Sequence, residues 1–222
     1  MFLKAIIGGC VFMICFFIQT KKNINYIAFG DSYTICTGTN NAEEQWPTSL
    51  AEHLSKNDLN VTLIANPSKN GYSTQNVIDY ELPLLKNTTT DFATLLIGVN
   101  DWVRGVDAKI YRKNLVFIIE AIQQKLSNKQ QLILITIPDF SATPQGALYG
   151  NGRDIAKGIA EFNMIIKEEA KKKNLPCIDI FALTQAMKNK PELIAKDGLH
   201  PSAIEYALWE ELIYKQALLT LK

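Results

Sequence analysis

The sequence feature that most constrains the fold is an alternation of short apolar runs with amphipathic segments, which starts near residue 25 and continues to the C-terminus. The apolar runs are nearly continuous, as in strands that are covered on both faces of a sheet. Strands are therefore predicted at residues 25–29, 60–65, 92–97, 131–137 and 177–181. Helices that alternate with such strands give an α/β fold with a five-stranded parallel sheet.

Amphipathic segments between these strands predict helices at residues 47–54, 73–85, 107–125, 154–173 and 201–219. In the second helix, Pro83 is expected to disturb the hydrogen bonding. In the third, Asp107 is the expected N-cap. The apolar face of that third helix is expected to consist of Ile110, Leu115, Ile118, Ile119 and Ile122. Because no linker, repeat or low-complexity tract interrupts the alternation, residues 21–222 are predicted to form one domain.

The composition excludes several classes of protein. Hydrophobic residues make up 47% and charged residues 20% of the 222 positions, so bulk disorder is excluded. Lys and Arg total 23 against 22 Asp and Glu, and without a basic excess nucleic acid is not an expected partner. With four cysteines, two histidines and no CxxC or HExxH motif, neither a disulfide scaffold nor a metal site of His and Cys ligands is expected.

Residues 1–20 have the pattern of a signal peptide. Lys4 precedes an apolar run at residues 5–18, and a polar exit follows. The run is shorter than the ~20 residues that span a bilayer, and it lacks the polar face of a helix that borders a core. We therefore expect an exported bacterial protein that is periplasmic, secreted or membrane-anchored. The alternatives to cleavage are a lipid anchor at Cys10 or Cys15, or an uncleaved anchor.

Polar motifs stand where predicted strands end, which is the edge at which parallel sheets bind ligands. The first strand ends in GDSYT at residues 30–34, which puts the Ser32 hydroxyl on a tight turn as a candidate nucleophile. In DGLHP at residues 197–201, Asp197 precedes His200 by three positions and can bend back to orient the imidazole as a base. The proline of this motif is expected to begin the closing helix. Each motif alone also suits an ordinary turn or helix cap.

Two further strand ends offer hydrogen-bond donors. Asn-Gly at residues 70–71 follows the second strand, and Gly71 lets the backbone approach a ligand and direct an N–H group at it. GVND at residues 98–101 follows the third strand, and the Asn100 amide can donate to an oxygen that develops negative charge. Both segments are also common turn or cap sequences.

Taken together, and in this order and spacing, the four motifs resemble the conserved blocks of the SGNH/GDSL hydrolase family. The resemblance covers the whole chain after residue 20. It implies a three-layer α/β/α sandwich with a flavodoxin-like sheet. It also implies hydrolysis of esters, thioesters or acyl groups on lipids, sugars or small molecules, without a metal or other cofactor. The pair GDSYT and DGLHP is most similar to the bacterial lysophospholipase- or arylesterase-like branch.

The resemblance assigns roles to single residues of this chain. Ser32 corresponds to the nucleophile, His200 to the general base and Asp197 to the residue that orients it. The backbone N–H groups of Ser32 and Gly71 and the side chain of Asn100 correspond to the oxyanion hole. The expected partner is a small-molecule, lipid or glycan ester, and contact with a membrane is expected only through the N-terminal segment.

Other functions use the same residues or the same fold. An acyltransferase or O-acetylesterase acting on a glycan would use the same catalytic groups with a different acceptor. A non-catalytic module would bind a small polar ligand at the same edge of the sheet, but it has no need of a nucleophile and a base together. A nucleotide-binding protein is disfavoured because the acidic Asp31 stands where a phosphate-binding loop is needed.

The pocket walls are expected in the loops at residues 37–46 and 140–151. The apolar residues expected there are Trp46, Phe140, Leu148 and Tyr149.

Four other residues near the motifs have no predicted catalytic role. Cys36 occupies a position where the family more often has a small glycine, and it is expected either to crowd the acyl group or to be buried. Asp101 and Asp139 follow strands, but Asp197 has the better spacing to His200. Arg104 is interpreted as a solvated surface residue, the alternative being contact with a polar or anionic substrate group.

Overall fold

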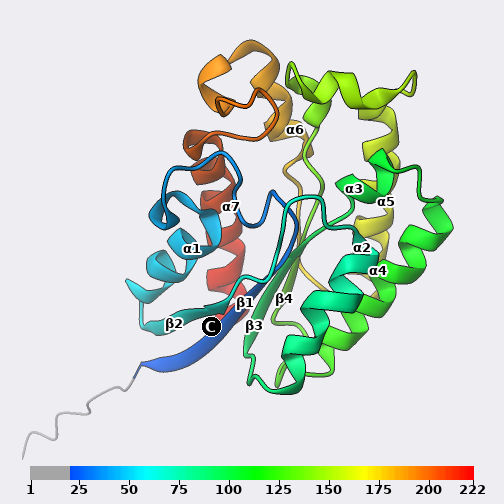
Figure 1. Cartoon of the computed structure of the whole chain (residues 1–222). Helices are drawn as coiled ribbons and strands as arrows, with labels where there is room; N and C mark the ends of the chain where they lie inside the picture. Colours follow the sequence, from blue (N-terminus) through cyan, green and yellow to red (C-terminus); the bar gives the residue numbers. More distant parts are fainter. Residues whose placement is uncertain (1–20) are drawn as a thin grey trace, which may run out of the picture.

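The computed structural model describes residues 21–222, and the predicted export segment at residues 1–20 lies outside the described part (Figure 1). Within residues 21–222, none of the helices combines the length and apolar character needed to cross a membrane.

The centre of the molecule is a sheet of five parallel strands in the order β2-β1-β3-β4-β5. The strands are β1 (Lys22–Gly30), β2 (Leu59–Ala65), β3 (Phe92–Leu96), β4 (Leu132–Ile135) and β5 (Cys177–Ile178). This order is that of flavodoxin-like sheets, in which the direction of winding reverses between β1 and β3. The predicted α/β class and five-stranded parallel sheet are confirmed.

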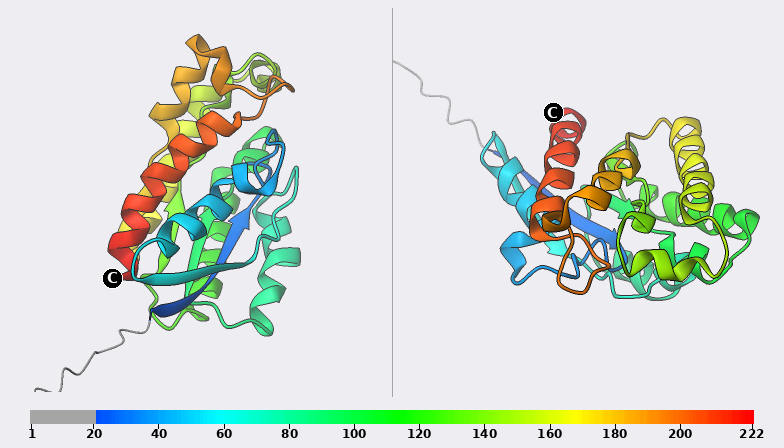
Figure 2. Two further views of the ribbon diagram at one scale, coloured as in Figure 1. Left: turned by 90° about the vertical axis from the view of Figure 1, so that its left-hand side faces the viewer. Right: turned by 90° about the horizontal axis from the view of Figure 1, so that it is seen from above.

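Helices cover both faces of the sheet, which makes three layers (Figures 1 and 2). On one face lie α1 (Trp46–Ser55) and α7 (Ala203–Leu221), and on the other lie α2 (Thr74–Asn76), α4 (Ala108–Gln123) and α5 (Ile155–Lys172). Double coverage explains why β3 and β4 are buried along their whole length. The largest fully buried side chains include Tyr26, Phe29, Trp46, Phe92 and Trp209. Burial of each such side chain contributes ~1.5–3 kcal/mol or more to folding.

Short helical segments that the sequence pattern does not predict complete the connections. They are α3 (Val99–Val103), α6 (Phe181–Thr184) and 3-10 segments at Ala42–Glu44, Phe140–Ala142, Gly146–Gly150, Gln185–Asn189 and Pro191–Leu193.

The predicted helix at residues 73–85 is not one regular α-helix but three short helical segments of different kinds. After α2 the chain forms a π-helical turn at Val77–Glu81 and then a 3-10 segment at Leu82–Lys86. Pro83, which has no N–H to donate, lies in the first turn of the 3-10 segment. The expected disturbance at this proline is confirmed.

The predicted apolar face of α4 is wrong at one position. Ile110 is 53% exposed, whereas its neighbour Tyr111 is fully buried. The buried face runs Tyr111, Leu115, Ile118, Ile119 and Ile122. Tyr111 lies four residues before Leu115, so it continues the helical spacing that Ile110 breaks.

The ends of two predicted elements also differ from the structure. β5 ends at Ile178 rather than at residue 181, because the side chain of Asp179 accepts the N–H of Phe181 and turns the chain into α6. The closing helix begins at Ala203 and not at Pro201, which forms an antiparallel bridge with Ile194.

Candidate active site

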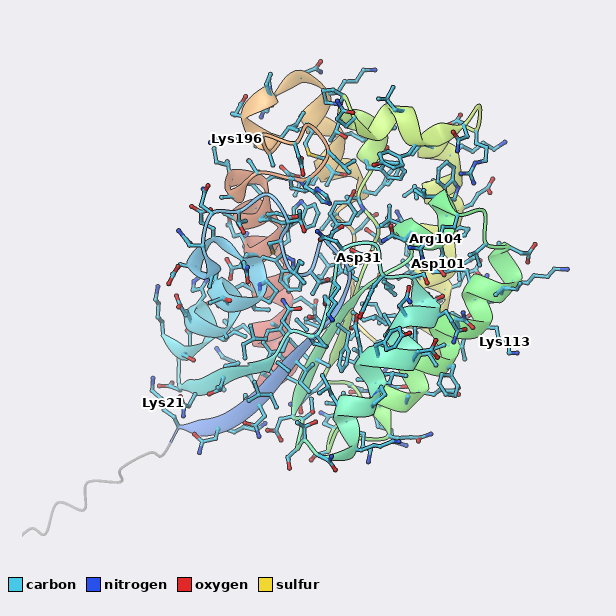
Figure 3. The ribbon with its side chains drawn as sticks, in the orientation of Figure 1. Lys21, Asp31, Asp101, Arg104, Lys113 and Lys196 are labelled. Carbon is cyan, nitrogen blue, oxygen red and sulfur yellow. The ribbon has the colours of Figure 1, made fainter. Side chains whose placement is uncertain are left out.

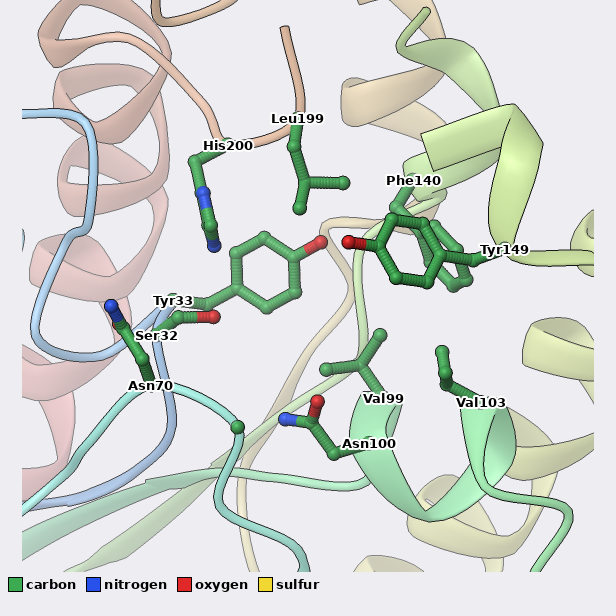
Figure 4. A pocket seen from close by; sticks show the side chains of 11 residues that line it. Ser32, Tyr33, Asn70, Val99, Asn100, Val103, Phe140, Tyr149, Leu199 and His200 are labelled. Carbon is green, nitrogen blue, oxygen red and sulfur yellow. The ribbon is translucent and has the colours of Figure 1, made fainter. Parts of the chain in front are cut away.

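A cavity of about 220 Å³ lies at the carboxyl ends of β1 and β3, where the winding of the sheet reverses (Figure 4). It brings together residues from five separate segments of the chain. The lining residues are Ser32, Tyr33, Asn70, Gly71, Val99, Asn100, Val103, Phe140, Tyr149, Leu199 and His200. Four of the five predicted site residues therefore share this cavity.

Ser32 lies on a tight turn directly after β1. The carbonyl of Asp31 accepts the N–H groups of Thr34 (3.0 Å) and Ile35 (3.1 Å), which folds the chain back over the strand end. Ser32 is 7% exposed, and its hydroxyl faces the cavity (Figure 4). The turn therefore presents a hydroxyl group above the sheet, as the sequence predicts.

His200 is held by the fifth predicted residue, Asp197. The ring Nδ1 of His200 lies 2.6 Å from Asp197 Oδ2, and the backbone N–H groups of His200 and Leu199 donate to Asp197 Oδ1 at 2.9 Å each. These bonds fix the position of the imidazole, and its other ring nitrogen, Nε2, points toward Ser32 (Figure 4). No hydrogen bond joins His200 to the Ser32 hydroxyl among the described residues, and such bonds often tighten only when substrate binds.

The charge on Asp197 is stabilised by the same hydrogen bonds. Partial burial acts to raise the pKa of Asp197, but the hydrogen bonds from the ring and backbone of His200 and from Leu199 outweigh it and lower the pKa. Asp197 therefore stays ionised at neutral pH and favours the proton on Nδ1 of His200, which leaves Nε2 free to accept one.

Close approach of two loops brings the histidine to the serine. Gly38 has φ +105°, and a Cβ there would lie 2.6 Å from Ala195 Cβ and 2.9 Å from the Pro201 carbonyl. The hydroxyl of Tyr206 also donates to the carbonyl of Thr37 at 3.1 Å. The loop after β1 can thus pack against the loop that carries His200 only because residue 38 has no side chain.

Donors converge on the side of the cavity formed by Gly71 and Asn100. Gly71 has φ +79°, a conformation that favours glycine. In the described part of the chain, no hydrogen bond uses the backbone N–H of Ser32 or of Gly71. Asn100 Nδ2 donates one hydrogen to the carbonyl of Tyr72 (2.9 Å), so a second amide hydrogen remains for a ligand.

Arg104 is exposed at the surface, as the sequence predicts, but it also has a partner near the cavity. Its Nη2 donates to the carbonyl of Gly71 at 2.7 Å. Figure 3 shows Arg104 next to Asp101, which lies in the same short helix. Arg104 is the C-cap of α3, the short helix that also carries Asn100. The two ends of this short helix therefore hold two successive carbonyl groups, that of Gly71 through Arg104 and that of Tyr72 through Asn100.

The two unassigned aspartates have structural partners. Asp101 accepts the backbone N–H of Thr74 at 2.9 Å and also its hydroxyl, and so it caps α2. Asp139 caps a 3-10 segment by accepting the N–H of Ser141 at 3.1 Å. Neither contacts His200, which agrees with the choice of Asp197.

The predicted pocket walls are correct for one loop and wrong for the other. Phe140 and Tyr149 line the cavity, but Leu148 points elsewhere and is 70% exposed. No residue at positions 37–46 lines it, because Trp46 is buried and donates to the carbonyl of Tyr33. Cys36 is buried as well, so it does not crowd the cavity.

A GDSL-like lipase/acylhydrolase family model matches residues 28–208, a range that includes all five predicted site residues. The chain belongs to this family. It is therefore an enzyme of the esterase type, and the predicted family resemblance is confirmed.

Individual relatives of this GDSL-like hydrolase are consistent with that result. An arylesterase from Vibrio mimicus is 28% identical over 159 residues, which cover 72% of this chain and 71% of the relative. A psychrotrophic esterase from Pseudoalteromonas sp. has a similar structure, with a TM-score of 0.67, 21% identity and coverage of 86% and 94% of the two chains. An acetylxylan esterase from Geobacillus stearothermophilus has a TM-score of 0.68 at 17% identity, with coverage of 90% and 96%.

Two buried carboxyl groups beneath the Ser32 turn of this GDSL-like hydrolase were not predicted. Glu81 accepts the N–H of Gly30 at 3.0 Å, and Asp31 accepts the N–H of Tyr33 at 3.0 Å. Both are fully buried, and burial raises the pKa of each to about 8. Among residues 21–222, however, no three acidic, histidine or cysteine side chains are grouped so as to hold a metal ion.

Proposed function

We propose that this enzyme is a serine esterase in which Ser32, His200 and Asp197 form a catalytic triad. The observation that carries the proposal is the 2.6 Å contact between His200 and Asp197 in the same cavity as Ser32. A histidine oriented by a carboxylate and directed at a serine is the arrangement that activates a hydroxyl nucleophile.

The reaction proceeds in two half-reactions. Ser32 Oγ attacks the ester carbonyl carbon while Nε2 of His200 takes the hydroxyl proton, and the carbonyl becomes a tetrahedral oxyanion. The bond to the alcohol oxygen then breaks as His200 returns the proton to it, which leaves an acyl group on Ser32. Water attacks this acyl-enzyme with His200 again as the base, and the acid leaves as Ser32 regains its proton.

The oxyanion is proposed to be bound by three donors. These are the backbone N–H groups of Ser32 and Gly71 and the free amide hydrogen of Asn100. Support comes from the fact that both backbone groups have no other acceptor among the described residues and that Asn100 has a hydrogen to spare. Donors that are fixed before the reaction stabilise the transition state without reorganisation.

We place the enzyme in the arylesterase- or lysophospholipase-like branch and expect it to act after export. The arylesterase from Vibrio mimicus supports the first alternative, and the signal-like pattern of residues 1–20 supports export. An acyltransferase or glycan O-acetylesterase would use the same groups. Addition of an alcohol or xylose acceptor during turnover separates the acyltransferase from the hydrolases, since a transferase forms a new ester and a hydrolase releases only acid.

The deciding experiment compares p-nitrophenyl acetate hydrolysis by the wild type, Ser32→Ala and a matched control, Ser127→Ala. Ser127 is exposed and precedes β4, at the far end of the sheet from the cavity. We expect Ser32→Ala to abolish measurable turnover and Ser127→Ala to leave it unchanged. The wild type should also gain one covalent ethylphosphonyl group on Ser32 when treated with an activated phosphonate ester, as seen by mass spectrometry.

Turnover by Ser32→Ala, or a phosphonyl group on another residue, would overturn the triad. A folded wild type that binds esters without turnover would instead favour a non-catalytic binding module.

A further inference from the structure

Two tyrosine hydroxyls face each other across the middle of the cavity. Tyr33 follows Ser32 in the turn after β1, and Tyr149 lies in the 3-10 segment Gly146–Gly150. Figure 4 shows the two rings entering from opposite sides, with their hydroxyl groups pointing toward each other. Both residues line the cavity. Burial raises the pKa of Tyr33, and the nearby charges of Asp31 and Asp197 raise it further, so the Tyr33 hydroxyl stays protonated at working pH.

The hydroxyl of Tyr33 differs from those of the other buried tyrosines. Tyr26, Tyr111 and Tyr206 each form a hydrogen bond through the hydroxyl, at 2.8 to 3.1 Å. Within residues 21–222, no protein group bonds to the hydroxyl of Tyr33 or of Tyr149. Tyr33 is only 3% exposed, so the cavity is where its hydroxyl finds water.

The ring of Tyr33 is fixed in this position. Its centroid lies 5.8 Å from that of His200 in an edge-to-face arrangement and 6.0 Å from that of Trp209. Its carbonyl accepts Nε1 of Trp46 at 2.9 Å. A substrate therefore meets the Tyr33 hydroxyl at a constant place and cannot push it aside at low cost.

The proposed function decides which part of the ester occupies this place. The leaving alcohol must lie near His200, which protonates it. Ser32 and His200 lie at one end of the cavity, and Val103, Phe140 and Tyr149 lie at the other (Figure 4). The acyl group therefore points away from His200, toward the two tyrosine hydroxyls.

We propose that Tyr33 and Tyr149 make this enzyme selective for esters of short acyl groups, from acetyl to butyryl. A short acyl group contacts Val99 and Leu199 and leaves both hydroxyls in contact with water. A longer alkyl chain covers them with atoms that neither donate nor accept, and buried polar groups without partners are unfavourable. The cavity volume of about 220 Å³ is also below the roughly 300–1,000 Å³ of pockets that enclose drug-sized ligands.

The test measures kcat/KM for p-nitrophenyl acetate, butyrate, hexanoate and octanoate, all below their critical micelle concentrations. The chains are the wild type, Tyr33→Phe, Tyr149→Phe and the double variant. Tyr80→Phe is the matched control, because Tyr80 is 62% exposed and does not line the cavity. Phenylalanine keeps the ring and its packing, and Tyr149→Phe changes an exposed segment, so at least this variant should fold.

For the wild type we expect kcat/KM for octanoate to be about tenfold or more below that for butyrate. Each Phe variant should raise the octanoate-to-butyrate ratio about fivefold or more, mainly through KM, and the control should not change the ratio. A wild type that prefers octanoate, or variants whose ratios match the wild type, would overturn the proposal. Turnover that depends on Ser32 but shows a flat chain-length profile would refute the selectivity alone, whereas turnover that survives Ser32→Ala would refute the proposed triad.

Discussion

At the scale of single residues, one amide hydrogen of Asn100 bonds the carbonyl of Tyr72, and the other has the proposed role of donating to the oxyanion. In Asn100→Ala we expect kcat to fall by roughly 10² to 10³, as for the loss of one oxyanion donor, with a much smaller change in KM. Steady-state kinetics on p-nitrophenyl acetate measure this, with thermal unfolding as a check that the variant folds. A variant with full kcat would exclude Asn100 from the oxyanion hole.

The buried carboxyl groups of Asp31 and Glu81 are expected to make the stability of the fold depend on pH. Burial raises the pKa of each carboxyl group to about 8, from the ordinary values of 3.8 for Asp and 4.5 for Glu. The folded protein thus binds more protons than the unfolded chain between these limits. The resulting stabilisation is present below about pH 4 and is lost as the pH rises through 8. The negative charge of Asp101 also raises the pKa of Asp31, and so it adds to the loss of stability as the pH rises.

We therefore expect the unfolding temperature of Glu81→Gln to fall less than that of the wild type between pH 5 and pH 9. Each kcal/mol corresponds to roughly 2–4 °C in a domain of this size. Differential scanning calorimetry at a series of pH values measures the difference. The exposed Glu43→Gln is a suitable control. Parallel curves for the wild type and Glu81→Gln would show that Glu81 is ionised in the folded state at neutral pH.

At the scale of elements, the short helix α3 holds the loop that presents Gly71. Arg104 at its C-cap bonds the Gly71 carbonyl, and Asn100 in its first turn bonds the next carbonyl along the chain. The Gly71 N–H belongs to the peptide group just before the one that carries the Gly71 carbonyl, so the helix sets the direction in which this N–H points.

Arg104→Ala should consequently lower kcat by about tenfold while KM changes little, because a misdirected donor affects the transition state more than the ground state. Arg104→Lys should recover part of the loss, since its ammonium can still reach a carbonyl oxygen. Lys113→Ala, an exposed cation on α4, serves as the control (Figure 3). Equal activity of the wild type and Arg104→Ala would mean that Gly71 is held without this bond.

Strands and motifs that a local sequence pattern marks could be predicted, whereas contacts between residues far apart in the sequence could not. Burial on both faces forces continuous apolar runs in β3 and β4, and the edge strand β2 keeps an alternating apolar pattern, so both kinds of strand could be predicted. Ser32, Asn100 and His200, which the structure brings to one cavity, could be proposed because each stands in a short motif at a strand or helix end. Glu81 and Arg104 bond to backbone groups more than 30 residues away, and no local sequence signal marks such contacts.

At the scale of the whole molecule, the strand order accounts for the position of the site. Reversal of winding between β1 and β3 leaves a crevice at their carboxyl ends that no crossover helix covers. The flavodoxin-like arrangement and its binding edge follow from the alternation of strands and helices. The exact pocket wall does not, because loop conformation decides that Tyr149 lines it and Leu148 does not.

The direction of β1 has a practical consequence. This strand runs from Lys22 to Gly30, roughly 30 Å, and it carries the chain from one end of the sheet to the Ser32 turn at the other. The C-terminal end of α7 also lies at the end where β1 starts (Figure 1). A bead, an electrode or a fluorescent fusion attached at either Lys21 or Lys222 would consequently leave the opening of the cavity facing bulk solution. An enzyme immobilised through either residue would therefore keep its cavity accessible to substrate.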